Sequence, residues 1–316
     1  MKIAVLMDDI GSINPIKDSS LAMMLEASRR GHSIYTFNSE DLFAQQGEAF
    51  AFAARTMVFD DDRHWFEKDA FVAMALTDFA VILMRKDPPF DMNYIYATYF
   101  LQLAQEQGVL VVNNPQALRD ANEKLFVLNF PQCMPKTLVS ANGRQIEDFI
   151  NQQKTAVVKP LDGMGGNDIF KFAAGDEQLD LVLQRLTNGG KTAIMVQEFL
   201  PQIAQGDKRI LLIDGKPIDY ALARIPKRGS FKGNLAAGAT GIGQPLSPRD
   251  YWLCQQIAPT LRAKGLLFVG LDVIGDYITE INVTSPTCLR ELDAQFGMNI
   301  AGMLFDRIEN NQALLD

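Results

Sequence analysis

Gly270-Leu-Asp-Val-Ile-Gly-Asp-Tyr-Ile-Thr-Glu-Ile-Asn282 contains two apolar β-type runs on either side of a Gly-Asp turn. This pattern predicts a β-hairpin. The hairpin carries three hard oxygen donors, and two of them, Glu280 and Asn282, are two residues apart on one strand, so they point to the same face. Oxygen donors on otherwise apolar strands cost desolvation free energy unless a positive group lies among them. Mg²⁺ is the natural candidate, because it takes a few such oxygens and completes its shell with phosphates and water.

The third donor, Asp272, joins that face only under particular hairpin geometries. A two-residue loop places Asp272 and Glu280 on opposite faces, whereas an odd loop such as residues 275–277, or a bulge, places them together. The alternative is that all three side chains lie on the solvated polar face of an antiparallel sheet.

Composition limits the class of protein. A chain of 316 residues is long enough for about two domains. Its net charge of -8 argues against general binding to nucleic acid or to anionic membranes. The apolar start is too short for a secretory or membrane-spanning segment. Three isolated cysteines, Cys133, Cys254 and Cys288, lack metal-ligand spacing, so we expect reduced thiols in a cytoplasmic protein.

The N-terminal part alternates between strand and helix patterns. Helix 21–30 follows a predicted N-cap at Asp18. Residues 40–70 are poorly patterned, and we expect an excursion with short helices there. The alternation predicts an α/β domain with a parallel sheet, with strands at 2–7, 34–37, 79–84 and 109–112 and further helices at 94–107 and 115–126. No GxGxxG follows the first strand, so a dinucleotide fingerprint is absent.

The pattern changes near residues 131–135, after which short strands recur. They predict an α+β region with mainly antiparallel sheets, with strands at 137–139, 156–159, 169–172, 194–199, 209–213 and 218–224 before the hairpin. We expect helices at 144–153, 176–188, 250–264 and near 300–310.

One lysine lies beside a glycine-rich turn. Ala156-Val-Val-Lys159-Pro160 ends a strand, and Asp162-Gly-Met-Gly-Gly-Asn167 follows it directly. Backbone N–H groups of such a turn approach phosphate closely, while the ammonium supplies charge. Most glycine-rich turns only reverse the chain, but the preceding buried-type lysine favours a phosphate site. Lys124 falls late in a predicted helix, and its own context indicates only a solvated lysine.

Three further segments have a functional and a structural interpretation. Residues 195–200 form a strand that can present backbone groups to a purine edge. Residues 226–243 hold five glycines and three basic residues, which suits a flap closing over phosphates but also fits plain disorder. Residues 282–291 leave the hairpin through hydroxyls and end near Arg290, which suits a carboxylate-bearing substrate or a capped helix start.

Five stretches carry a family resemblance over essentially the whole chain. They are Met84-Arg-Lys-Asp-Pro-Pro-Phe-Asp91, Lys159-Pro-Leu-Asp-Gly-Met-Gly-Gly166, Gly233-Asn-Leu-Ala-Ala-Gly238, Gly270-Leu-Asp-Val-Ile-Gly275 and Thr279-Glu-Ile-Asn-Val-Thr-Ser-Pro-Thr-Cys288. The chain resembles the ATP-grasp carboxylate–amine ligases, and within them the bacterial glutathione synthetases. The resemblance implies an N-terminal α/β (pre-ATP-grasp) domain at 1–122, a small central ATP-grasp domain at 123–200, and a C-terminal ATP-grasp domain at 201–316 with a flexible flap at 226–243.

The resemblance also implies the roles of individual residues. ATP is expected on Lys124, Lys159, Gly163, Gly165, Gly166, Gln197, Glu198, Phe199, Leu200 and Asp207. Mg²⁺ or Mn²⁺ is expected on Asp272, Glu280 and Asn282. Arg209, Arg224 and Lys232 are expected at the reacting groups, and Lys232 stands where the family leads us to expect arginine. Substrate contacts are expected from Asp18, Ser19, Arg85, Lys86, Asp87, Asn234, Ser285, Thr287 and Arg290.

The implied reaction joins γ-glutamylcysteine to glycine through an acyl phosphate, in a cytoplasmic homo-oligomer such as a tetramer. No residue is assigned as a general base. Two other functions remain open: another ATP-grasp ligase, of the D-alanyl-D-alanine or glutamate-adding type, and a non-catalytic ATP-binding regulatory protein.

Overall fold

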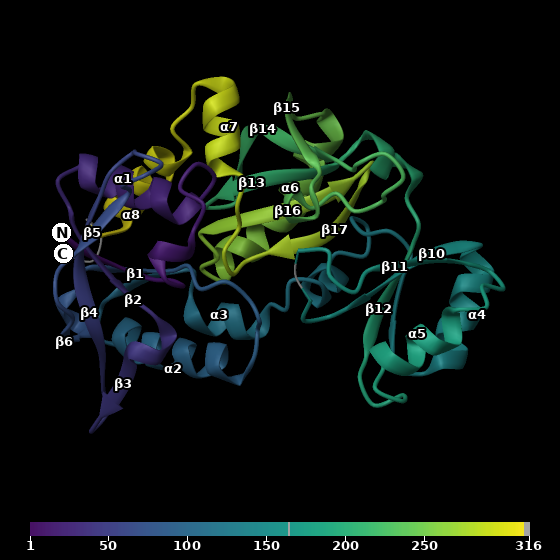
Figure 1. Ribbon diagram of the computed structural model, residues 1–316, viewed down its shortest axis with the longest axis horizontal. Helices are drawn as coiled ribbons and strands as arrows, with labels where there is room; N and C mark the ends of the chain where they lie inside the picture. The colour runs from purple at the N-terminus through teal and green to yellow at the C-terminus, as the bar shows by residue number, and fades with distance from the viewer. Residues whose placement is uncertain (164, 313–316) are drawn as a thin grey trace.

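The chain forms three β-sheets, which lie side by side in Figure 1. The N-terminal sheet is on the left, the sheet within residues 207–282 is in the middle, and the sheet within residues 137–198 is on the right. The computed structural model describes residues 1–163 and 165–312. Residue 164 in the glycine-rich run and the end of the predicted C-terminal domain, 313–316, lie outside the described residues.

The first sheet has a parallel centre in the order β2-β1-β7-β8. Its central strands are buried on both faces, because helices cover them. These strands are β1 (Lys2–Leu6), β2 (Ser33–Phe37), β7 (Val81–Met84) and β8 (Leu110–Val112), with helices α1 (Ser19–Arg29), α2 (Met92–Glu106) and α3 (Pro115–Asp120). The predicted N-cap is confirmed, since Leu21 N donates to Asp18 Oδ1 at 2.6 Å.

The expectation of short helices over 40–70 is wrong. This segment forms antiparallel strands that extend the first sheet: β3 (Leu42–Gln45), β4 (Glu48–Val58) and β5 (Phe66–Lys68), followed by β6 (Val72–Ala75). Only short 3-10 turns occur nearby, η1 (Ile10–Ser12), η2 (Ser39–Asp41) and η3 (Leu76–Asp78). The buried face of β4 carries Ala49, Ala51 and Ala53, small residues that give no strong strand signal.

The predicted helix over 115–126 is too long. Helix α3 ends at Asp120, and a separate 3-10 turn η4 (Leu125–Asn129) begins after Lys124. Asn122 Oδ1 accepts from Lys124 N and Leu125 N at 3.1 and 2.9 Å, so its side chain replaces the helical acceptor. Lys124 is therefore not a solvated helix lysine but is 4% exposed.

The second sheet is antiparallel throughout its described strands, in the order β11-β10-β12-β9. It consists of β9 (Thr137–Ser140), β10 (Thr155–Pro160), β11 (Phe170–Ala173) and β12 (Ile194–Glu198), with α4 (Gly143–Gln153) and α5 (Leu179–Leu186). Apolar residues of α4 and α5 pack on this sheet and form a core of their own. It lies on the right of Figure 1.

The third sheet is also antiparallel, in the order β15-β14-β13-β16-β17. Its strands are β13 (Asp207–Ile213), β14 (Lys216–Ile225), β15 (Thr240–Pro245), β16 (Phe268–Ile274) and β17 (Tyr277–Asn282), with η5 (Pro201–Gln205), η6 (Leu235–Ala237) and α6 (Pro248–Ala263). Treating all of 226–243 as a loop is therefore wrong, because its end forms β15. The sequence concealed this strand because backbone pairing with β14 needs no side chains, and Gly241 and Gly243 supply none.

The chain returns to the first sheet at its end. Helices α7 (Leu289–Phe296) and α8 (Ile300–Gln312) follow the third sheet, and α8 lies beside α1 (Figure 1). The Arg30 guanidinium fixes this contact through ion pairs to Asp306 and Glu309 at 2.7 and 2.6 Å. The Asn113 side chain holds the third sheet against the first. Its Nδ2 donates to the carbonyls of Phe268 and Val283, and its Oδ1 accepts from Phe268 N. Across the described residues, no helix is both long and apolar enough to cross a bilayer.

Candidate active site

The hairpin of β16 and β17 contains a bulge. Ile274 pairs with Tyr277 across a two-residue turn, but the register shifts between Asp272 and Val273. Asp272 consequently lies opposite Glu280, as the bulge alternative predicted. Asp272 is only 4% exposed, so the alternative of a solvated polar face is wrong for this residue.

A cavity of about 310 Å³ lies where the three sheets approach one another. Its walls bring together residues that are far apart in sequence, from the first sheet's loops to β17. Twenty of the predicted site residues line it: Asp87, Lys124, Lys159, Gly163, Gly165, Gly166, Gln197, Glu198, Phe199, Leu200, Asp207, Arg209, Arg224, Lys232, Asn234, Asp272, Glu280, Asn282, Ser285 and Thr287.

Five predicted substrate residues do not line this cavity: Asp18, Ser19, Arg85, Lys86 and Arg290. Two of them support its wall. Arg85 donates to the carbonyl of Pro286 at 3.0 Å, between the lining residues Ser285 and Thr287, and Ser19 Oγ accepts from Leu289 N at 3.4 Å.

The other three are engaged elsewhere. Asp18 caps α1, and Lys86 forms an ion pair with Asp8 at 2.6 Å. Arg290 donates to the carbonyl of Pro15 and pairs with Asp60, beside a separate groove.

Two arginines and two aspartates form a buried charge cluster at one end of the cavity. Arg209 Nε lies 2.6 Å from Asp272 Oδ1, and Arg224 Nη2 lies 3.0 Å from Asp272 Oδ2. Burial alone would raise the pKa of Asp272, but the two guanidinium groups hold it below the ordinary value of an aspartate. Asp272 is thus an anion in the folded protein.

Asp207 completes this cluster and has a free oxygen. Its Oδ2 pairs with Arg224 at 2.5 Å, whereas its buried Oδ1 has no hydrogen-bond partner among the described residues. Burial raises the pKa of Asp207 against the opposing charge of Arg224. Because an unpaired buried oxygen is costly, Oδ1 is available to a ligand hydroxyl.

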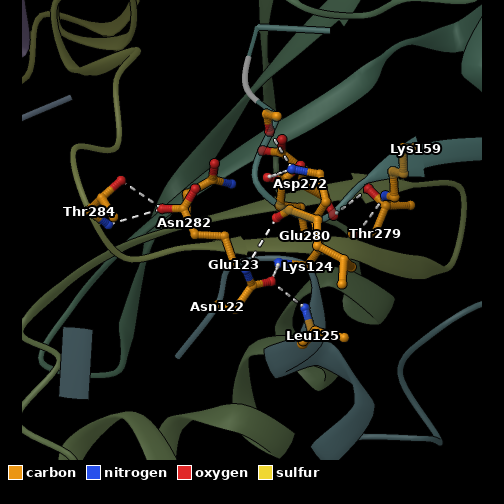
Figure 2. Close-up of polar contacts among 12 residues, drawn as sticks. Asn122, Glu123, Lys124, Leu125, Lys159, Asp272, Thr279, Glu280, Asn282 and Thr284 are labelled. Carbon is orange, nitrogen blue, oxygen red and sulfur yellow. Dashed lines mark hydrogen bonds and ion pairs between the residues drawn. The ribbon is translucent and has the colours of Figure 1, made fainter. Parts of the chain in front are cut away.

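Two buried lysines face the hairpin from the other side, as Figure 2 shows. Lys124 Nζ donates to the carbonyl of Gly163 at 2.6 Å and pairs with Glu280 Oε1 at 3.2 Å. Lys159 Nζ donates to the carbonyl of Thr279 at 3.1 Å. Burial lowers the pKa of Lys159 to about 8. The bulge residue Thr279 and its neighbour Glu280 thus contact both lysines.

The flap and the glycine-rich turn meet over the cavity. Gly166 has φ +83°, and a Cβ at this position would lie 2.7 Å from Asn234 Oδ1. A Cβ at Gly233 would lie 2.5 Å from Asp207 Cβ. Gly166 is therefore required for the close approach of the turn to the flap, and Gly233 for the close approach of the flap to β13. Phe231, Lys232 and Leu235 of the flap also line the cavity.

The end of β12 forms an apolar wall. Phe199 lies under the Lys171 ammonium, with the nitrogen 3.7 Å from the ring centroid. Glu198 Oε1 accepts from Lys136 N at 2.9 Å, which holds the end of the strand in place. Phe199 and Leu200 both line the cavity here.

The oxygen donors of the hairpin fit a divalent cation. Asp272 and Glu280 lie on opposite strands at one register position. Asn282 Nδ2 donates to the carbonyl of Gly270 at 3.2 Å, which leaves the amide oxygen as the acceptor. Two carboxylates and one amide are a donor set that Mg²⁺ accepts when phosphates and water complete the shell.

Sequence reasoning did not single out Glu123. Its Oε1 accepts from Val283 N, Thr284 N and Thr284 Oγ1 at 2.8, 3.0 and 2.8 Å, and it lines the cavity. Burial, together with nearby Glu280, raises the pKa of Glu123. The only signal was its place beside Lys124, and the predicted helix hid it.

Comparison with known families decides the assignment. Residues 123–297 match the model of the prokaryotic glutathione synthetase ATP-grasp domain, and residues 1–119 match the N-terminal domain of the same enzymes. The chain belongs to the prokaryotic glutathione synthetase family. It is therefore an ATP-grasp ligase, and the predicted family and fold class are confirmed.

Similar proteins agree with this family. The chain is 54% identical to a glutathione synthetase of Pseudomonas syringae pv. tomato over 309 residues, covering 98% of this chain and 97% of that one. It is 52% identical to one from Xanthomonas campestris pv. campestris over 313 residues, covering 99% of each.

Solved structures share the fold at low identity. The D-cycloserine synthetase DcsG has a TM-score of 0.68 at 15% identity, with 99% of this chain and 100% of that one covered. The ATP-grasp ligase PsnB, solved with a minimal precursor, Mg and ADP, has a TM-score of 0.61 at 16% identity, with 99% and 98% covered.

Proposed function

We propose that this protein joins γ-glutamylcysteine to glycine at the expense of ATP. The cysteinyl carboxylate attacks the γ-phosphorus, which gives an acyl phosphate and ADP. The glycine amine then attacks the acyl carbon, and phosphate leaves. The observation that carries the proposal is a cavity in which buried cations converge on a hairpin with three oxygen donors, on a chain of this family. These cations come from the second sheet, from the third sheet and from Lys124 directly before η4.

ATP is assigned to the side of the cavity formed by the second sheet. Lys124 and Lys159 hold the phosphates, while the glycine-rich turn at 163, 165 and 166 approaches them with backbone N–H groups. Residues 197–200 lie along the adenine. The free Oδ1 of Asp207 accepts from a ribose hydroxyl, which satisfies the one oxygen left unpaired.

Asp272, Glu280 and Asn282 are assigned to Mg²⁺ or Mn²⁺. Such a cation neutralises charge on the phosphates as the two anionic reactants meet. Lys124 Nζ lies 3.2 Å from Glu280 Oε1. The Glu280 carboxylate would therefore contact both the lysine and the cation. This arrangement ties the phosphate-binding lysine to the metal site.

Arg209, Arg224 and Lys232 are assigned to the reacting groups. Attack of a carboxylate on a phosphate brings two anions together, and fixed cations in a water-poor cavity lower that barrier. An acyl phosphate hydrolyses in open water, so the closed flap protects it. The chain's own task is thus to place charge and exclude solvent.

Substrate contacts are assigned to Asp87, Asn234, Ser285 and Thr287, which line the cavity. Ser19 and Arg85 then support its wall, and Asp18, Lys86 and Arg290 serve contacts elsewhere. We also propose the domain limits 1–122, 123–200 and 201–316, a homo-oligomer and a cytoplasmic location.

A coupled ADP-release assay tests the proposal. We expect ADP to form only when γ-glutamylcysteine and glycine are both present. ADP formation with D-alanine alone, or with glutamate and a peptide, would show a different ligase. Nucleotide binding without turnover on any pair would show a regulatory protein. Glu280→Ala should abolish synthesis, and wild-type turnover by this variant would overturn the metal assignment.

A further inference from the structure

Two residues from outside the third sheet cover the outer edge of β17: Cys133, whose carbonyl accepts from Ile278 N at 2.8 Å, and Glu123. β17 is the last strand of the third sheet, so its outward N–H groups have no neighbouring strand. Ile281 N donates to the carbonyl of Glu123 at 2.9 Å. Val283 N and Thr284 N donate to Glu123 Oε1, and so does Thr284 Oγ1 (Figure 2). Glu123 therefore binds two consecutive residues that follow the hairpin, Val283 and Thr284, through its side chain, and Ile281 through its backbone carbonyl.

These bonds alternate with the proposed cation ligands. Glu280 and Asn282 point into the cavity, while Ile281 and Val283 offer their N–H groups to Glu123. The backbone is consequently fixed on both sides of Asn282 and directly after Glu280. A ligand side chain on such a strand keeps its direction only if its backbone does.

The same short segment binds the glycine-rich turn. Asn122 Nδ2 donates to the carbonyl of Leu161 at 3.1 Å, and Lys124 Nζ donates to that of Gly163. Residues 122–124 therefore connect the phosphate-binding turn of the second sheet to the hairpin of the third. Glu123 lies at the centre of this connection.

We propose that Glu123 is a positioning residue for the cation site. It acts through the backbone of β17, where it fixes the orientation of Glu280 and Asn282 relative to Lys124. The proposal rests on the proposed function, because it assumes that these two residues hold a cation.

A carboxylate at this place costs electrostatic free energy. Glu123 lines the same cavity as Glu280, and two nearby carboxylates repel each other in a low-dielectric site. A neutral acceptor would cover the edge without that repulsion. A cation held by Glu280 would offset that repulsion.

Calorimetry of nucleotide binding separates this role from a purely structural one. The nonhydrolysable analogue AMP-PNP is titrated into wild type and Glu123→Ala, once with Mg²⁺ and once with EDTA. We expect Glu123→Ala to weaken binding about tenfold or more with Mg²⁺, the size of losing charge-assisted hydrogen bonds. Metal-free binding should stay within about twofold of wild type, because Lys124 and Lys159 remain.

Two companion variants sharpen the result. Glu123→Gln keeps an acceptor oxygen for the three donors and should recover most of the Mg²⁺-dependent affinity. Glu147→Ala, an exposed carboxylate on α4, should leave both titrations unchanged.

Three results would overturn the proposal in different ways. If Glu123→Ala keeps the full gain from Mg²⁺, the positioning role is wrong. If it loses metal-bound and metal-free binding equally, Glu123 only supports the fold. If wild type itself gains nothing from Mg²⁺, the cation site of the proposed function is wrong, and this role fails with it.

Discussion

Replacing Gly166 by alanine tests whether the flap and the glycine-rich turn must close together. The residue has φ +83°, which costs an L-residue about 1 kcal/mol. The added Cβ would also lie 2.7 Å from Asn234 Oδ1 and 3.3 Å from its Cγ, inside the ~3.5 Å of ordinary contact. The Asn234 side chain must therefore move away from the turn.

The loss of this contact sets the expected magnitude. Losing one close interloop contact in the transition state should cost about 1.4 kcal/mol, which is tenfold in kcat/KM. The coupled ADP-release assay with both substrates measures it. Gly175→Ala is the matched control, because Gly175 has φ +79° in the same domain but nothing within 4 Å of its Cβ. It should lose stability by a similar amount and keep its kcat/KM.

Equal kinetics for the two alanine variants would refute this reasoning. The contact itself is tested by combining Gly166→Ala with Asn234→Ala. If the clash is the cause, the double variant should be no slower than Asn234→Ala, because the obstructing amide is gone. Independent, additive losses would show that Gly166 acts through another route.

Four further predictions concern three side chains, Lys159, Lys232 and Asn113. Because burial lowers the pKa of Lys159 to about 8, the ATP affinity should fall as pH rises through 8, and Lys159→Arg should bind equally well across that range in a calorimetric pH series. The same lowered pKa means that the unfolded chain holds this proton up to about 10.5, so denaturant titrations should show a stability contribution that rises between pH 8 and 10.5, lost in Lys159→Met. Lys232→Arg should reduce ADP release uncoupled from product, because a guanidinium binds the intermediate in a bidentate manner; unchanged uncoupling would remove this explanation. Asn113→Ala breaks its three buried hydrogen bonds to Phe268 and Val283 and should lower the free energy of unfolding by about 3 kcal/mol in urea titrations, whereas a loss under 1 kcal/mol would show that the sheets are held elsewhere.

The sequence correctly predicted those helices and strands that neighbouring residues in the chain determine. Strands such as β1 and β7 are continuous apolar runs between turn residues, and helix α1 has its cap at Asp18, so both could be read from neighbours in the chain. Strand β4 was missed because alanine on its buried face is also a good helix former. Strand β15 was missed because its pairing depends on β14, not on its own side chains.

The same limit applies within the site. Glu280 and Asn282 share a face by the two-residue period alone, which the sequence contains. The place of Asp272 depended on a bulge, and two geometries were open until the register was known. Glu123 could not be found, because its role comes from residues about 160 positions later in the chain.

The carboxylates of the cavity also explain why the folded protein tolerates its buried positive side chains before any ligand binds. Five cations line it, Lys124, Lys159, Arg209, Arg224 and Lys232, together with six carboxylates, Asp87, Glu123, Glu198, Asp207, Asp272 and Glu280. Buried charges are tolerated when they are paired, and removing one partner leaves the other uncompensated. A nucleotide and its cation bring charges of both signs, so they can exchange partners with these pairs without leaving a bare charge on either side. Single deletions in this cluster should therefore reduce folding stability as well as turnover, and only paired replacements separate the two effects.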